Sequence, residues 1–82
     1  MAKREMTTID MRDLLNHIDH FGNGAVVRKM GRKWFIDFRG FGFPTPFATK
    51  NAAMIMVSEW RVAIHRRMRE LGVDRYGHKL AA

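Results

Sequence analysis

The strongest restriction on the fold comes from a long helical pattern near the C-terminal end of the sequence. From Lys50 to Leu71, apolar residues recur at the three- and four-residue spacing of one helix face. Thr49 precedes the segment as a side-chain N-cap, and Gly72 follows it as a residue that ends helices. A helix of about six turns must bury this face. Its apolar stripe comprises Ala53, Met56, Val57, Trp60, Ala63, Ile64, Met68 and Leu71.

The middle of the chain has the composition of a β-sheet that could cover this helix. Residues 25–30 and 34–39 are rich in β-branched and aromatic residues, and residues 31–33 between them predict the turn of a hairpin. Residues 40–47 predict a weak third strand, with Phe43, Thr45 and Phe47 on one face. It must lie at an edge because its two prolines lack N–H donors. Alternation places one set of the second strand's side chains on the core face, namely Trp34, Ile36 and Phe38.

A second helix is predicted before the hairpin, over residues 8–20. Thr7 offers a hydroxyl cap with Asp10 three residues later, and residues 22–24 (GNG) tolerate the backbone that ends a helix. Its apolar positions follow helical spacing and are Met11, Leu14, Leu15, Ile18 and Phe21.

These elements predict one small α+β domain over residues 1–72. Their order is helix, strand, strand, weak strand and long helix, with the C-terminal helix covering an antiparallel sheet. A chain of 82 residues has room for one small core only. Residues 73–82 lack periodicity and are expected to form a flexible basic tail, whose last four residues are compatible with a cloning scar.

Several classes of function are disfavoured by the residue types present. The chain has no cysteine, which removes disulfides and thiolate sites and agrees with a cytoplasmic location. It has no apolar run of membrane-spanning length. His17 and His20 could share a helix face with Asp13, but no fourth metal ligand is evident. Ser58 lacks the partners of a nucleophile. We therefore expect a non-enzymatic protein with no catalytic residues, no cofactor, no metal and no membrane partner.

Positive charge is concentrated in the later part of the chain. Of 15 Lys and Arg and 8 Asp and Glu, residues 1–24 hold three and four, whereas residues 25–82 hold twelve and four. The sequence predicts that cations of the hairpin and the long helix converge on one patch that binds a polyanion. The candidate residues are Arg28, Lys29, Arg32, Lys33, Arg39, Arg61, Arg66, Arg67 and Arg69.

Three phenylalanines are candidates for stacking or docking. Phe35 alternates onto the outer strand face beside cations. Residues 39–43 (RGFGF) match the start of the aromatic motif of RNA-recognition-motif domains, in which strand aromatics stack on bases. Pro44 follows where that motif continues, and that fold begins with a strand rather than a helix. We therefore interpret the segment as a Gly/Phe-rich loop that presents Phe41 and Phe43.

Residues 25–64 resemble the three-stranded sheet plus helix of phage-integrase arm-type DNA-binding domains. The likeness is carried by the hairpin, by residues 47–53 (FATKNAA), similar to an F-x-T-K-x-x-A phrase that leads into the helix, and by Trp60 within that helix. The resemblance implies a sheet that lies in the DNA major groove. The sequence departs from the family by its first helix and by two prolines in the third strand. The DNA-facing residues it implies are Arg28, Arg32, Lys33 and Arg39.

Two functions are compatible with these observations. The first is a small accessory or regulatory protein of bacterial or phage type that binds nucleic acid, DNA rather than RNA, by neutralising phosphates. The second is an inhibitor or adaptor that docks its basic and aromatic surface on an acidic host protein, with Phe35, Phe41 and Phe43 as anchors. We expect a monomer or a weak homodimer, because the prolines blunt the open sheet edge.

Overall fold

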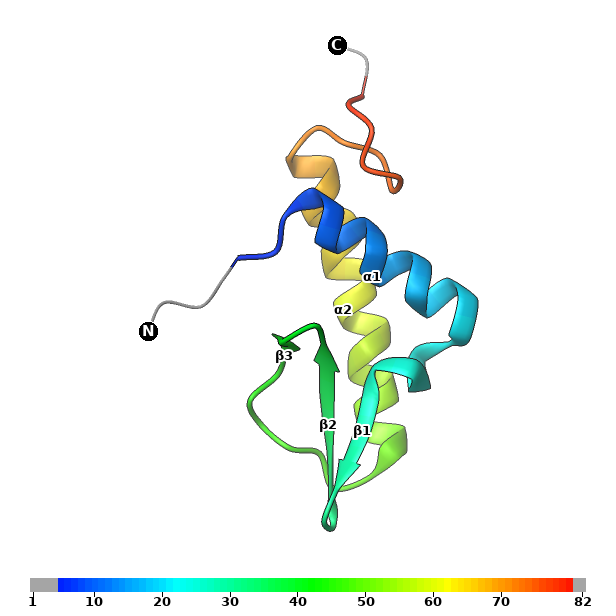
Figure 1. Ribbon diagram of the computed structural model, residues 1–82, viewed down its shortest axis with the longest axis vertical. Helices are drawn as coiled ribbons and strands as arrows, with labels where there is room; N and C mark the ends of the chain where they lie inside the picture. Colours follow the sequence, from blue (N-terminus) through cyan, green and yellow to red (C-terminus); the bar gives the residue numbers. More distant parts are fainter. Residues whose placement is uncertain (1–4, 81–82) are drawn as a thin grey trace.

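A computed structural model describes residues 5–80 of the chain (Figure 1). The elements in chain order are α1 (Thr8–Phe21), the 3-10 helix η1 (Asn23–Val26), β1 (Val27–Met30), β2 (Lys33–Phe38), β3 (Phe41–Gly42) and α2 (Lys50–Glu70). The strands form an antiparallel sheet in the order β1-β2-β3. The predicted α+β architecture, with the C-terminal helix packed on a small antiparallel sheet, is confirmed.

Helix α1 begins at the predicted capping box. The Thr7 hydroxyl accepts from the Asp10 amide at 3.1 Å, and the Asp10 carboxylate accepts from the Thr7 amide at 2.9 Å. Four of the five predicted apolar positions are buried, but Phe21 is 68% exposed. Phe21 is the last residue of α1, and the chain turns away at Gly22, whose φ is 86°. Its ring lies beside the rings of His17 and His20, with ring centres 5.1 and 5.4 Å away.

Two tight turns define the sheet. The β1–β2 turn is Gly31-Arg32, with a positive φ at Gly31, as in a type II′ turn. The β2–β3 turn is Arg39-Gly40, with φ values of 53° and 85°, the pattern of a type I′ turn. The hairpin is shorter than predicted, because residues 25–26 belong to η1.

The third strand lies at the predicted edge and within the predicted segment, but it is shorter than predicted. It is formed by Phe41–Gly42, and the segment with the two prolines leaves the ladder. The chain returns at Phe47, whose N–H and C=O bond to the backbone of Trp34 at 2.8 and 2.9 Å. This bridge places the start of α2 beside the β1–β2 turn.

Helix α2 crosses the inner face of the sheet with its first half and packs against α1 with its second half (Figure 1). Thr49 caps its start as predicted, accepting from the Ala52 amide at 3.1 Å. Its end is a Schellman motif, in which Gly72 donates to Arg69 and Val73 donates to Met68, each at 3.0 Å. The buried members of its stripe are Ala53, Val57, Ile64 and Met68.

The predicted stripe of α2 was too wide. Ala63 is exposed and Leu71 is 44% exposed. Ala63 points past the edge of the surface that α2 covers, and Leu71 lies beyond the last helical residue as the C-cap. The sheet and α1 cover only a narrow face of this 21-residue helix, so residues at the sides of the predicted stripe stay exposed.

The segment expected to be a flexible tail folds back against the end of α2 over residues 73–80. Val73 and Lys79 form a β-bridge, and the Leu80 amide donates to the Gly72 carbonyl at 2.9 Å. Arg75 in this loop forms an ion pair with Asp19 of α1. Val73 packs against the core, whereas the other contacts named here are backbone hydrogen bonds and an ion pair, which hydrophobic periodicity does not reveal. Residues 81–82, part of the segment read as a cloning scar, lie outside the described residues.

Candidate nucleic-acid interface

Among residues 5–80, α2 packs on one face of the sheet. The strand register puts Val27 opposite Ile36 and Lys29 opposite Trp34, so these side chains share the inner face with the helices. Helix α2 contacts both β1 and β2, and its buried residues belong to the same core cluster as Ile36 and Phe38 of that inner face. The outer face therefore presents the alternate residues, namely Arg28, Met30, Lys33, Phe35 and Asp37.

Cations surround the free end of the β1–β2 hairpin from both sides. Arg28 and Lys33 lie on the outer face, and Arg32 occupies the turn. On the inner side, the ammonium of Lys29 lies 5.6 Å from the ring centre of Trp34. The ammonium of Lys50, the first residue of α2, lies 5.9 Å from the same ring.

Lys50 is the site residue that the sequence prediction missed. The sequence predicts Lys50 only as the start of the long helix, and the candidate cations do not include it. The Trp34–Phe47 bridge brings the first turn of α2 to the hairpin, and that pairing joins residues 13 positions apart. The sequence does show a cation directly after the Thr49 cap. Its position beside the hairpin, however, follows only from the Trp34–Phe47 bridge.

These cations have little competition from carboxylates. Arg28 lies 3.9 Å from Asp37, and both side chains are largely exposed. Within residues 5–80, no carboxylate lies within 4.0 Å of the other four. We call this group the hairpin surface, defined as Arg28, Lys29, Arg32, Lys33 and Lys50 together with Phe35.

Two predicted site residues bind α1 instead. The guanidinium of Arg39 is 2.8 Å from the Asp13 carboxylate, and that of Arg61 is 2.6 Å from Asp19. The hydrogen bond from Arg39, aided by Arg12, holds the pKa of Asp13 below its ordinary value of 3.8. Arg39 and Arg61 therefore tie the sheet and α2 to α1, and their charge is partly neutralised there.

The remaining predicted cations, Arg66, Arg67 and Arg69, lie in the last turns of α2. Arg67 is 3.7 Å from Glu70, whereas the other two have no carboxylate within 4.0 Å among the described residues. Figure 1 shows this end of α2 and the hairpin turn at opposite ends of the long axis, along which the molecule extends 48 Å. The prediction that the hairpin cations and the helix cations converge on one patch was therefore wrong. The hairpin turn lies beside the first residue of α2 and not beside its last turns.

The three candidate aromatic residues lie in different environments. Phe35 is half-buried on the outer face, opposite Arg28 in the ladder. Phe41 is half-buried and pairs with Phe38, which puts it on the inner face. Phe43 packs against the core, with its ring centre 5.5 Å from that of Trp60 and 6.4 Å from that of Phe47. Only Phe35 belongs to the hairpin surface.

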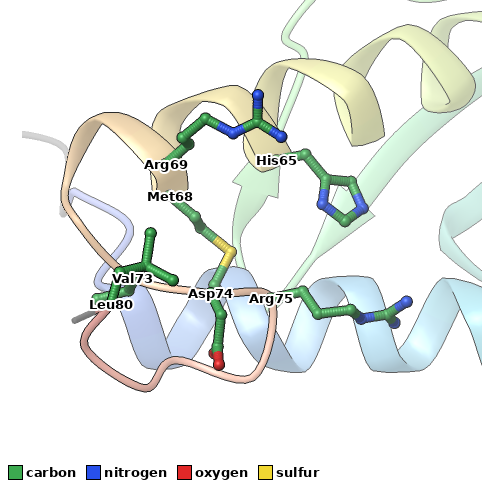
Figure 2. Close-up of a pocket in the computed structure, with 7 residues that line it drawn as sticks. All are labelled: His65, Met68, Arg69, Val73, Asp74, Arg75 and Leu80. Atoms are coloured by element: carbon green, nitrogen blue, oxygen red, sulfur yellow. The ribbon is translucent and has the colours of Figure 1, made fainter.

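A hollow of about 320 Å³ lies where the C-terminal loop closes on α2 (Figure 2). His65 and Met68 project from α2 toward it, while Arg75 runs along its edge toward α1. Burial, together with the charges of Arg61 and Arg75, holds the pKa of His65 below its ordinary value of 6.5. The hollow is the seam between these elements, and it is remote from the hairpin surface.

No protein-family model, curated protein or solved structure matches this chain. Within residues 5–80, no group of three or more His, Cys, Asp or Glu side chains is placed to hold a metal ion. In the same part of the chain, no helix has the length and apolar character needed to cross a membrane.

Proposed function

We propose that this protein binds nucleic acid, DNA in preference to RNA, through the hairpin surface and without catalysing a reaction. The observation that carries the proposal is the gathering of five cations at one end of the molecule with a single carboxylate among them. Neutralising phosphates with such cations releases condensed counterions, which is the main source of affinity in non-specific binding. The absence of cysteine in the sequence supports a cytoplasmic location as part of the proposal.

The shape of the hairpin favours duplex DNA. A two-stranded β-ribbon fits the major groove of B-form DNA, whereas the major groove of A-form RNA is too narrow for side chains to read. The outer face offers Arg28 and Lys33 toward phosphates and Phe35 toward apolar groups. The order β1, β2, β3 and α2 is also the order that the resemblance to arm-type domains implies, with α1 added before it.

The proposal is tested by fluorescence anisotropy with a labelled duplex of about 20 base pairs, titrated at several salt concentrations. Engaging five phosphates predicts a slope of log affinity on log salt of about −4.5. The double variant Arg32→Glu/Lys33→Glu should weaken binding about ten-fold or more and reduce that slope by about 2.

The matched control is Arg67→Glu/Arg69→Glu, which makes the same change in net charge at the opposite end of α2. It should affect binding far less than the hairpin variant. Equal losses in the two variants would show that only net charge matters, and the proposed site would then be wrong. Undetectable binding of the wild-type chain at low salt would reject nucleic-acid binding itself.

Docking on an acidic host protein has less support. That alternative requires exposed aromatic anchors, but Phe43 is partly buried and packs against the core beside Trp60 and Phe47. Phe41 is half-buried on the inner face of the sheet. We therefore propose nucleic acid alone as the ligand of the hairpin surface.

A further inference from the structure

The solvent side of α2 carries a regular row of residues that nothing in residues 5–80 covers. The row repeats at spacings of four and three residues, which keeps its members on one helix face. Its two aliphatic members, Ile55 and Val62, are 58% and 59% exposed. We call it the outer row of α2, defined as Ile55, Glu59, Val62, Ala63, Arg66 and Arg69, all of which are exposed.

Among the described residues, the charged members of the outer row have no ion-pair partners. Glu59 forms no ion pair among the described residues, and neither does Arg66. Each lies three or four positions from the small apolar pair Val62 and Ala63, on opposite sides of it. The row therefore has an acid, an apolar centre and a base in sequence along the helix.

This arrangement is complementary to itself. We propose that two copies of the chain associate through the outer row, with their α2 helices antiparallel about a two-fold axis that passes between Val62 and Ala63. Around such an axis, Glu59 of each copy faces Arg66 of the other copy, and Val62 faces Ala63. The same patch is used on both subunits, which is the usual form of a homodimer interface.

The charges select this register. An axis at Arg66 would place two guanidiniums against each other, and an axis at Glu59 would oppose two carboxylates. Only an axis midway between them pairs both acids with both bases and also brings the apolar centres together. The small side chain of Ala63 allows the helices to approach closely at that point.

The outer row differs from the hairpin surface in a way that favours a protein partner. It combines Ile55, Val62 and the acid Glu59 with its two arginines, whereas on a phosphate-binding surface the Glu59 carboxylate would repel the phosphates. The partner it fits by charge is a second copy of itself. The interface is small and the chain carries a formal charge of +7, so we expect a weak dimer. This inference does not rest on nucleic-acid binding.

Sedimentation equilibrium of the nuclease-treated protein, from about 10 µM to about 1 mM, tests the proposal. The wild-type chain should shift from monomer to dimer across this range. Glu59→Arg and Arg66→Glu should each abolish the dimer, because each opposes like charges across the axis. The double variant Glu59→Arg/Arg66→Glu should restore it, because the two charges are exchanged.

The matched control is Arg32→Glu, which lowers the net charge by the same amount as Arg66→Glu but lies in the hairpin turn. It should leave the dimer intact. A wild-type chain that stays monomeric over the whole range would overturn the proposal, and so would a folded double variant that does not dimerise. Folding of each variant is verified by circular dichroism.

Disulfide capture provides a second measurement that does not depend on charge. The sequence contains no cysteine, so a single Val62→Cys substitution introduces the only thiol. Two such thiols lie close together beside the proposed axis, and mild oxidation should yield a covalent dimer. The control Ile9→Cys has the same exposure, 58% against 59% for Val62, but lies on α1. Equal cross-linking of the two variants would show random collision and reject the interface.

Discussion

Gly42 occupies a position in the sheet that has no room for a side chain. A Cβ atom at this position would overlap the carbonyl oxygen of Ile36, and the φ of Gly42 is 159°. The neighbouring amide of Phe43 donates to that carbonyl at 3.3 Å, so β3 depends on this close approach. The backbone of Gly42 therefore allows the β3 edge to pair with β2.

We predict that Gly42→Ala destabilises the protein by about 2–3 kcal/mol, because the new methyl group must displace backbone atoms. The measurement is urea unfolding followed by circular dichroism. Gly24→Ala is the control, since its Cβ would meet only the Cε of Lys50 at 3.8 Å. That substitution should change stability by less than about 1 kcal/mol. Similar losses in both variants would contradict the steric argument.

Helix caps and turns were predicted well from the sequence, because they depend on residues that are close together along the chain. Thr7 with Asp10 and Thr49 with Gly72 mark helix ends that the structure confirms. Phe21 shows the limit of such signals. It fits the helical spacing of the stripe, but its burial depended on how far the rest of the fold extends, which spacing does not encode.

At the scale of elements, one carboxylate joins three parts of the chain. Asp19 of α1 accepts hydrogen bonds from Arg61 of α2, at 2.6 Å, and from Arg75 of the C-terminal loop. The hydrogen bond from Arg75 is the main cause that lowers the pKa of Asp19. These ion pairs are partly screened by solvent, so each contributes modestly to stability.

We predict that Asp19→Asn releases the loop of residues 73–80 more than it destabilises the fold. Global stability should fall by about 1 kcal/mol, because an amide pairs weakly with two guanidiniums. The amide of Leu80, which bonds to Gly72, should exchange with solvent much faster. Hydrogen exchange followed by NMR measures this directly. In the control Asp37→Asn, whose partner Arg28 is 3.9 Å away and exposed, the exchange of Leu80 should stay unchanged.

The arrangement of elements was less predictable than the elements themselves. The third strand was expected over residues 40–47, but β3 ends at Gly42, because the prolines that follow lack the N–H donors that would continue the ladder. The site was predicted in part, since four of its cations were identified. Its fifth member, Lys50, depended on the bridge between Trp34 and Phe47, a non-local pairing with no local signal.

At the scale of the whole molecule, charge is divided between ends that face different surroundings. The β1–β2 turn lies at one end of the long axis, and the C-terminal end of α2 lies toward the other (Figure 1). That end of α2 carries Arg66 and Arg69. The sum of charges along the sequence shows that the protein is basic. It does not show how the cations are distributed over the folded surface. The separation leaves two surfaces available for two different partners.

The pH dependence of stability is a property of the whole fold. The pKa of His65 is lowered by burial, so the unfolded chain takes up that proton first as the pH falls below 6.5. The pKa values of Asp13 and Asp19 are lowered by arginines, so their contribution is present above 3.8 and is lost as pH falls further. We predict a plateau of stability above pH 6.5 and two successive losses below it. The measurement is urea unfolding at a series of pH values.

His65→Gln serves as the control for this pH series, because it removes the first titrating group and leaves both aspartates. It should abolish the loss that begins near pH 6.5 and retain the loss at lower pH. An unchanged first step in this variant would contradict the assignment to His65.

The two tryptophans occupy separate places in this architecture. Trp34 lies among the lysines of the hairpin surface, whereas Trp60 packs against Phe43 within the core. The protein thus contains two tryptophan fluorophores, one beside the ligand site and one among the packed rings. With Trp34 replaced by Phe, emission reports unfolding alone; with Trp60 replaced instead, it reports occupancy of the hairpin, and no dye has to be attached.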